Sequence, residues 1–493
     1  MASRIRRALT KSRVKHTNSV VASKSQSFAF NFPFEITTQI LIYASQVHYD
    51  GPAQKPEFNV SPLVLCRVSK AWRSYISLQP IFWSRIIISL SQTLRWKHTY
   101  IRELYHWLHR AQDMALDVYI VGYLPPGILF ATSVAVGIRD FLTSNSSRWR
   151  TIDALDLEDT TLIMLPTFFS SAARSPFFTH LKTLVLRTSS PSPRGPFIPS
   201  DFRSSPALGA LRLVGFTSPF SLASQIFSIT TLTLSYNSCD SCCSLLRAFP
   251  CLVDADLHYE MDYLTCTCIW DGLWYLPHDH VRSLTIRTRY SDSHMNVPSH
   301  LQAPALEDLH ISIEGRRSKN CDISGIADLL RESGCRLVRL TLQLSLPEEC
   351  NIIQLLGLLP GLLELHLRDV EPSAEYSSTL GFSRTFFDAL HPHSRNLVLP
   401  SLRFLTVGGT LAIDSLDALE GLVLRLRQTW PKGGAAPGPS FSTSVVKLQF
   451  AKLQADQKGL NLEEKGSLFA SDLKLFMETN ILWLINSDGS TWI

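Results

Sequence analysis

The side chains that could support chemistry in this sequence are histidines and cysteines with short spacings. His278 and His280 form one pair and His391 and His393 form another, and imidazole nitrogens are among the ligands that zinc prefers. Each pair lies beside a proline in an expected loop, and the spacing places no third ligand nearby. We therefore interpret both pairs as surface histidines.

Six of the ten cysteines cluster between residues 239 and 268. Zinc sites usually combine two Cys-x-x-Cys or His-x-x-x-His halves, and this cluster lacks the second half at the usual separation. We expect reduced thiols, several of them buried as small hydrophobic residues, and no metal. The cluster consists of Cys239, Cys242, Cys243, Cys251, Cys266 and Cys268.

No catalytic set of residues can be assembled from the sequence. The glycine-rich run at 433–438 neither follows a strand pattern nor opens a helix, and no Lys-Ser or Lys-Thr follows it, so it does not form a phosphate-binding loop. A Gly-x-Ser-x-Gly motif is absent from the sequence. We expect that the chain is not an enzyme and binds no cofactor.

The positive charge of the chain is concentrated at its N-terminus. Seven basic residues and no acidic one precede Glu35, so the formal net charge of +5 leaves −2 for the remainder. A basic disordered tail is the preferred interpretation, with a nuclear-import patch or a mitochondrial transit peptide as alternatives. Because the remainder is not basic, we expect no nucleic-acid partner.

One stretch, residues 118–138, is uncharged over a length that could span a membrane. Pro125, Pro126 and Gly127 interrupt it, and its two halves have the patterns of a strand and a helix. We expect no membrane association. Since no secretion signal is recognisable, the expected location is the cytoplasm or the nucleus.

The elements that would position a binding surface repeat along the chain. A frame of the form apolar-x-x-apolar-x-apolar occurs ten times between Ile152 and Val407, and successive middle residues are separated by 29, 27, 21, 23, 29, 25, 31, 25 and 40 positions. Most spacings are close to the 20–29 residues typical of leucine-rich repeats. The middle residues are Leu155, Leu184, Leu211, Leu232, Ala255, Leu284, Leu309, Leu340, Leu365 and Leu405.

Each frame predicts a short strand because its apolar residues alternate with period two. Apolar helical stretches, such as 326–330 and 352–356, lie between frames. Repeated strand–helix units predict an α/β fold: a curved leucine-rich-repeat solenoid with parallel strands on the concave face and helices on the convex face. The alternative is a chance occurrence of leucine-rich frames in another α/β fold, which ten frames at these spacings disfavour.

Residues beside the apolar positions of each frame should point to the concave face, because neighbouring strand residues face opposite sides. The set is charged and of mixed sign. It predicts a substrate-binding surface, with a solvated polar face as the alternative. The candidates are Arg212, Asp256, His258, Arg287, His310, Arg339, Glu364, His366 and Arg368, and the wider set adds Asp156, Glu158, Arg187, Asp254 and Asp308.

Residues 31–90 have helical periodicity instead. Pro33 stands at the entry of a first helix that carries Ile36 and Ile40 on one face. After a loop, the sequence predicts a second helix from Leu63 to Arg73.

At these positions the sequence resembles an F-box, whose pattern is Leu-Pro-x-Glu, an apolar helix, Val-Cys-Lys-x-Trp and Pro-x-x-Trp. Residues 32–35, 68–72 and 80–83 take those places, with Phe32 for the first Leu, Ser69 for Cys, and a longer loop. The segments around Trp107 and Trp149 are similar to the connector of fungal F-box proteins with leucine-rich repeats.

The resemblance implies a substrate receptor of a cullin-RING (SCF-type) ubiquitin ligase. The module would bind a Skp-type adaptor, and through it a cullin, while the repeats would bind a protein substrate. The alternative is a leucine-rich-repeat scaffold that binds proteins without joining a ligase. The candidates for the adaptor face are Phe32, Pro33, Ile36, Ile40 and Val68, unless Ile36, Ile40 and Val68 fill the module's own core; Trp72 and Trp83 are expected to be core residues.

The expected organisation follows from these patterns. It comprises a basic tail (1–30), the F-box-like module (31–90), a connector with a first strand and helices (91–150), the repeats (151–431), a linker (432–444) and a C-terminal repeat and cap (445–493). Within the last part, the sequence predicts a strand at 445–450 and a closing helix at 468–485.

Overall fold

The structure, a computed structural model, describes a defined part of the chain. The described residues are 33–48, 57–122, 133–155, 178–192, 205–216, 228–236, 246, 248–259, 276–288, 301–313, 323–344, 349–369, 384–390, 398–411, 445–453 and 482–485.

A single 14-stranded sheet runs through the described chain, and every adjacent pair of its strands is parallel. Its strands follow one another in chain order, as stacked repeats require. In order they are β3 (Arg85–Ser89), β4 (Leu116–Val121), β5 (Trp149–Leu155), β6 (Thr183–Ser192), β7 (Ala210–Phe216), β8 (Thr231–Tyr236), β9 (Asp254–Tyr259), β11 (Ser283–Thr288), β13 (Asp308–Ile313), β14 (Arg339–Leu344), β15 (Glu364–Asp369), β16 (Phe404–Leu411), β17 (Val445–Leu453) and β18 (Leu482–Ile485).

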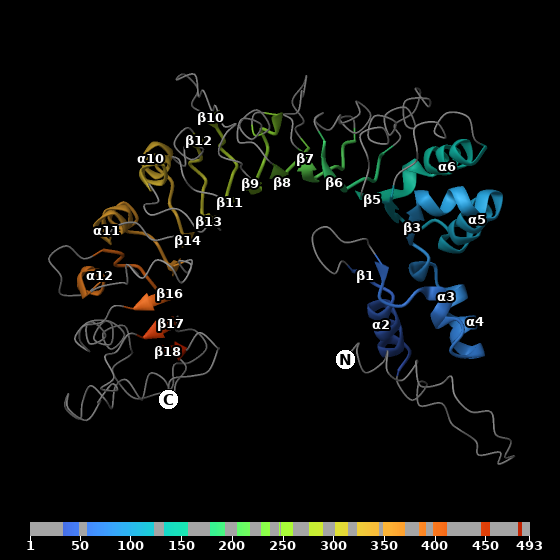
Figure 1. Cartoon of the computed structure of the whole chain (residues 1–493), viewed down its shortest axis with the longest axis horizontal. Helices are drawn as coiled ribbons and strands as arrows, with labels where there is room; N and C mark the ends of the chain where they lie inside the picture. Colours follow the sequence, from blue (N-terminus) through green and yellow to red (C-terminus); the bar gives the residue numbers. More distant parts are fainter. Residues whose placement is uncertain are drawn as a thin grey trace, which may run out of the picture.

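The sheet bends into an arch with its strands on the inside (Figure 1). Helices α10 (Ser324–Ser333), α11 (Glu349–Gly357) and α12 (Arg384–Ala389) lie between successive strands of the chain, and α10 and α11 are on the outside of the arch. The predicted curved α/β solenoid, with parallel strands inside, is therefore confirmed. A short parallel pair, β10 (Leu276–Pro277) and β12 (Leu301–Gln302), forms a second small sheet.

The apolar frames form the core of the solenoid. Leu284, Leu309, Leu340, Leu365 and Leu405 are paired in register across adjacent strands, and each is at most 1% exposed. Burying such a side chain stabilises the fold by about 1.5–3 kcal/mol, so the stacked frames supply the main favourable contribution.

The first frame was placed three residues too late. Leu184 pairs with Ile152 rather than Leu155, so the buried frame of β5 is Trp149, Ile152 and Ala154. Leu155 occupies an alternate position of the strand, on the side opposite the frame. Tryptophan and alanine in place of leucine concealed this register.

The sheet also begins earlier than predicted. Trp83, just before β3, and Ile86 and Ile88 on β3 form a buried frame inside the 31–90 segment, and β4 precedes β5. Two helices connect these strands, α5 (Leu90–Ala111) and α6 (Ser133–Ser144). As expected, part of the uncharged 118–138 stretch is strand and part is helix. No helix among the described residues is long and apolar enough to cross a membrane.

The N-terminal module is built from α2 (Phe34–Ala44), α3 (Pro62–Leu65), α4 (Lys70–Leu78) and the 3-10 turn η3 (Pro80–Phe82), with a small antiparallel pair, β1 (Val47–His48) and β2 (Glu57–Phe58). Pro33 immediately precedes α2, where its missing N–H costs nothing. Phe32 lies outside the described residues.

The predicted single helix from Leu63 to Arg73 is wrong, because the helical conformation is interrupted between α3 and α4. Ser69 adopts an extended conformation, and its Oγ accepts a hydrogen bond from the backbone N–H of Trp72 at 3.1 Å. Ser69 is therefore the N-cap of α4, whereas α3 already ends at Leu65 with Cys66 as its C-cap.

Trp83 joins the module to the sheet. Its side chain is fully buried, its Nε1 donates to the carbonyl of Ile76 at 2.8 Å, and its ring lies 4.9 Å from that of Trp107. The guanidinium of Arg110 stands 4.4 Å from the Trp83 ring centroid. The prediction of Trp83 as a core residue is confirmed, whereas Trp72 is half-buried against the same core.

A tyrosine of α5 covers the outer edge of β3. The Tyr100 hydroxyl accepts a hydrogen bond from the backbone N–H of Ser89 at 2.9 Å and donates to the carbonyl of Ile87 at 3.3 Å. Since β3 has a sheet neighbour on one side alone among the described strands, these backbone groups belong to its open edge.

At the C-terminus, the predicted strand at 445–450 is confirmed by β17. The predicted helix at 468–485 is wrong for 482–485, which form β18 beside β17; the remainder of that segment lies outside the described residues. The apolar sequence Leu-Trp-Leu-Ile also suits a strand, and β17 offers it an edge.

Candidate functional site

The inner face of the arch presents three rows of side chains across strands β9 to β15. Residues paired in register on these parallel strands lie side by side, and alternate residues of each strand face inward. The acidic row is Asp254, Ser283, Asp308, Arg339 and Glu364; the middle row is Asp256, Thr285, His310, Thr341 and His366; the basic row is His258, Arg287, Ser312, Gln343 and Arg368.

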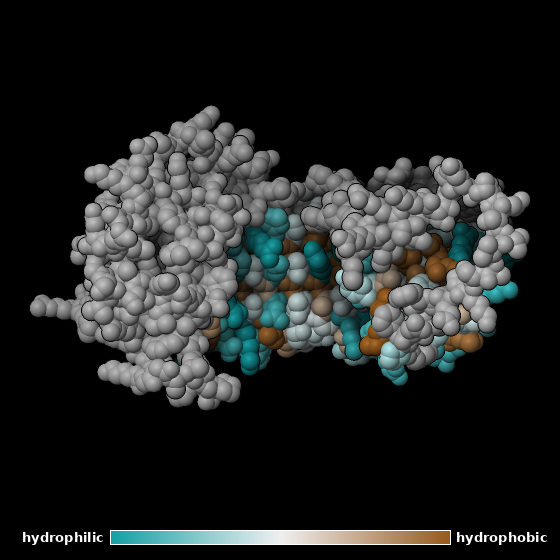
Figure 2. All heavy atoms as spheres, turned by 90° about the horizontal axis from the view of Figure 1, so that it is seen from below, coloured by the Kyte–Doolittle hydropathy of each residue, from teal (hydrophilic) through white to brown (hydrophobic). Residues whose placement is uncertain are grey.

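Figure 2 looks onto this hollowed face and shows hydrophilic side chains along it, with hydrophobic ones between them. The sequence-predicted candidates from Asp256 to Arg368 are therefore brought together on one surface, all of them half-buried or exposed. Arg212 is also exposed, two strands before β9 on β7.

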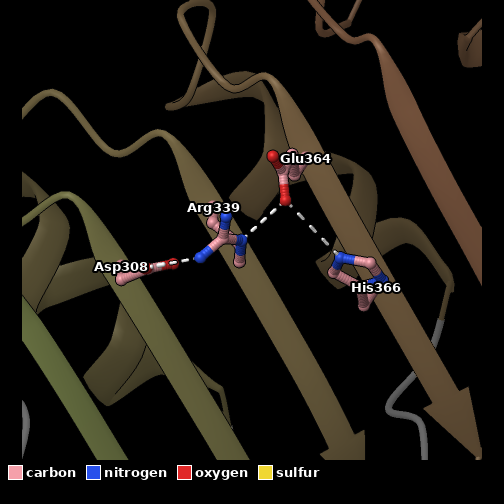
Figure 3. Close-up of polar contacts among 4 residues, drawn as sticks. All are labelled: Asp308, Arg339, Glu364 and His366. Atoms are coloured by element: carbon pink, nitrogen blue, oxygen red, sulfur yellow. Dashed lines mark hydrogen bonds and ion pairs between the residues drawn. The ribbon is translucent and has the colours of Figure 1, made fainter. Parts of the chain in front are cut away.

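Arg339 is the centre of a polar network in this surface (Figure 3). Its Nη1 lies 2.7 Å from Asp308 Oδ2, and its Nε lies 2.6 Å from Glu364 Oε2. His366 Nε2 is 3.9 Å from the same Glu364 oxygen. One guanidinium thus links the carboxylates of the strands on either side of β14.

The network shifts the ionisation of its members. The hydrogen bond from Arg339 lowers the pKa of Glu364, and the hydrogen bond to Glu364 raises the pKa of Arg339. Burial raises the pKa of Asp308 despite the nearby Arg339, and burial lowers the pKa of His366. The face therefore favours a neutral imidazole at His366 beside an ionised Glu364.

A second, looser pair lies on the neighbouring strands. Arg287 Nη2 is 3.6 Å from Asp256 Oδ2, with both side chains about a third to a half exposed, at 48% and 35%. Burial, and then the charge of Arg287, lower the pKa of His310. Ser312 donates a hydrogen bond to Gln343 at 3.3 Å, so polar contacts also cross the basic row.

One of the wider candidates does not take part in this surface, and two others cannot be placed on it or off it. Arg187 is buried, with its Nη2 donating to Asp153 Oδ2 at 2.8 Å, because the corrected frame of β5 turns Asp153 toward it. Asp156 and Glu158 lie outside the described residues.

The N-terminal module carries a different surface, made of exposed apolar side chains. Ile36 and Ile40 on α2 are 46% and 50% exposed, and Val68 after α3 is 51% exposed, so these three residues do not fill the module's core. Pro33 is also exposed. That they contact an adaptor stays a prediction.

The sequence interpretation missed two members of this apolar patch. Leu63 and Val64 on α3 are 48% and 44% exposed. The sequence analysis placed both in one helix from Leu63 to Arg73 and included neither among the candidates for the adaptor face. Ser61, whose Oγ accepts from the Leu63 N–H, was the available indication that a separate short helix begins there.

The residues with metal-binding potential are mostly dispersed. His278 is buried, contrary to the expected surface position, because it lies directly after β10 and its backbone N–H donates to Gln302 of β12 at 2.7 Å. His280 is exposed as expected. Among the described residues no group of three His, Cys, Asp or Glu side chains could hold a metal ion. His391, His393 and five of the six clustered cysteines lie outside the described residues.

Comparisons with known proteins add little to this geometry. No family model and no curated protein match the sequence. A crystal structure of a Bacteroides fragilis protein aligns with a TM-score of 0.30 and 12% identity, over 61% of this chain and 80% of that chain. The crystal structure of the LRIM1/APL1C complex aligns with a TM-score of 0.24 and 11% identity, over 68% of this chain and 57% of that chain. Both likenesses are distant.

Proposed function

We propose that this chain is the substrate-recognition subunit of a cullin-RING (SCF-type) ubiquitin ligase. The module at 31–90 binds a Skp-type adaptor and through it a cullin, and the inner face of the solenoid binds a protein substrate. The ligase role comes from the F-box resemblance of the sequence. The observation that carries it further is the apolar patch, the set of exposed apolar side chains on α2, α3 and the turn after α3: Ile36, Ile40, Leu63, Val64 and Val68.

Such a patch is costly for a monomer. Burying apolar surface is favourable by about 25 cal/mol per Å². Clusters of exposed apolar side chains therefore mark interaction sites. Eight of the thirteen large hydrophobic residues that are exposed in the described chain belong to the module, which is a small part of it. The concentration supports a partner that covers α2 and α3.

The two surfaces have different chemistry and lie in different parts of the chain. The patch is apolar, which suits a stable complex, while the inner face of the arch is charged, which suits selection among partners. Both surfaces stand on one continuous cluster of buried residues, which extends from the module into the sheet. This supports a receptor that holds a substrate at a fixed position relative to the adaptor.

An affinity pull-down of the full chain tests the proposal. The unmodified chain should recover a Skp-type adaptor and a cullin, and Ile40→Asp or Val68→Asp should each reduce adaptor recovery at least tenfold. Both residues are about half exposed, so the variants should keep the thermal stability of the parent.

The matched control is Leu358→Asp, the same kind of change at a 42% exposed position after α11. It should leave adaptor recovery intact. A folded full chain that recovers no adaptor would contradict the proposal and favour a protein-binding scaffold that stands outside a ligase.

A further inference from the structure

The charges on the inner face are sorted by position along the strands. The acidic row contains three carboxylates and one guanidinium, for a net charge of −2. The basic row contains Arg287 and Arg368 and no acidic side chain, for a net charge of +2. The face therefore carries two stripes of opposite sign that cross the strands.

The dimensions of these stripes constrain what can lie on them. The acidic and basic rows are four residues apart along each strand, which corresponds to about 13 Å. From β9 to β15 there are four strand spacings, or about 19 Å. An α-helix is about 10–12 Å wide with its side chains, and about 13 residues of helix span that length.

The spacing along the stripes also favours a helix. Side chains on one flank of a helix recur with its pitch of about 5.4 Å, close to the strand spacing of about 4.8 Å. Side chains on one edge of an extended segment recur at about 6.7 Å, and so fall out of step with the strands within a few residues.

We infer that the inner face between β9 and β15 binds a helical segment of a partner protein that carries Lys or Arg on one flank and Asp or Glu on the other. The basic flank lies over the acidic row, and the acidic flank lies over the basic row. The middle row, with Thr285, Thr341 and two histidines, provides short polar contacts beneath the helix, and its one carboxylate, Asp256, lies 3.6 Å from Arg287 of the basic row. This inference rests on the proposed function in so far as the bound helix belongs to the substrate.

Two residues allow a clean test. Asp254 and Arg368 are exposed, and neither has an ion-pair partner within the described part of the chain. The double variant Asp254→Lys with Arg368→Glu brings both rows to zero net charge and keeps the total charge of the protein constant. A loss of binding in this variant therefore reports on the stripes and not on the overall charge.

The experiment is a surface-display selection with the full chain as bait and no adaptor present. One library holds 14-residue segments in a stable helical scaffold, with both flanks randomised among Lys, Glu, Gln and Ser. A second library holds linear segments of the same composition with a central proline. We expect helical binders with Lys on one flank and Glu on the other, at least tenfold weaker affinity for the double variant, and weakening by added salt.

Three outcomes would overturn the inference: no helical binders, binders whose charges are not segregated between flanks, or preferential enrichment of the linear library. If the double variant is unstable in a thermal melt, Asp254→Asn with Arg368→Gln replaces it, and equal affinity for that variant and the parent also overturns the inference. Because the selection uses no adaptor, its result is independent of the pull-down that tests the ligase role.

Discussion

At the scale of single residues, the position within a frame decides what a side chain does. Leu340 and Arg339 are neighbours in β14, yet the leucine is fully buried. The arginine side chain is 44% exposed and forms ion pairs with two carboxylates. The same alternation separates Leu365 from Glu364 on β15. Register is therefore the quantity that a residue-level experiment can test.

We predict that Leu340→Ala lowers the free energy of unfolding by about 2–5 kcal/mol, through lost burial and a residual cavity. Arg339→Ala should lower it by less than about 1 kcal/mol, because exposed ion pairs contribute little. Denaturant melts of the two variants provide the comparison. Equal losses in both variants would mean that the assigned register is wrong.

His278 makes stability depend on pH. Burial lowers the pKa of this imidazole below its usual 6.5, so the unfolded chain binds a proton at a higher pH than the folded chain does. As pH falls through about 6.5, the unfolded state takes up more protons and the free energy of unfolding decreases. His310 and His366, whose pKa values burial also lowers, act in the same direction.

We predict that the parent chain is less stable at pH 5.5 than at pH 7.5, and that His278→Leu reduces this difference. The measurement is the denaturant midpoint of both proteins at both pH values. An unchanged difference in the variant would show that the imidazole of His278 does not carry the effect.

At the scale of elements, a short turn and the N-cap residue Ser69 separate α3 from α4. The sequence interpretation predicted one helix because the apolar residues from Leu63 to Val68 continue in pattern toward Trp72. The Ser69 cap divides them, and the two short helices aim Leu63 and Val64 outward. An N-cap residue can be recognised in sequence, but here it and the apolar helical periodicity predict different helix boundaries. Tertiary packing decides which boundary the chain adopts.

We predict that Ser69→Ala destabilises the chain by about 0.5–2 kcal/mol, and that Ser69→Asp restores most of this loss, because a carboxylate oxygen can accept the same N–H bond. Ser74→Ala, at an exposed position inside α4, is the control and should be neutral or slightly stabilising. Thermal melts distinguish these outcomes. If Ser74→Ala lost as much stability as Ser69→Ala, the effect would come from removing any serine hydroxyl and not from removing the cap.

At the scale of the whole molecule, the sequence allowed the solenoid and most of its register to be predicted, because nine of the ten frames are spaced and composed as the fold requires. The two ends were harder. The first strands use Trp83, Trp149 and Ala154 where later repeats use leucine, and β18 has a pattern that suits either structure. The pairing of Arg339 with both neighbouring carboxylates depends on strands 25 and 31 residues away, which periodicity alone cannot connect.

The contact between Tyr100 and the edge of β3 has a consequence for solubility. A terminal strand with free N–H and C=O groups can pair with the edge of another molecule, and long parallel stacks are prone to such growth. The Tyr100 hydroxyl occupies one donor and one acceptor of that edge. We predict that Tyr100→Phe leaves the sheet intact but increases concentration-dependent self-association, measured by light scattering. A variant that remains monomeric over the same concentration range would show that other groups protect this end of the stack from polymerising.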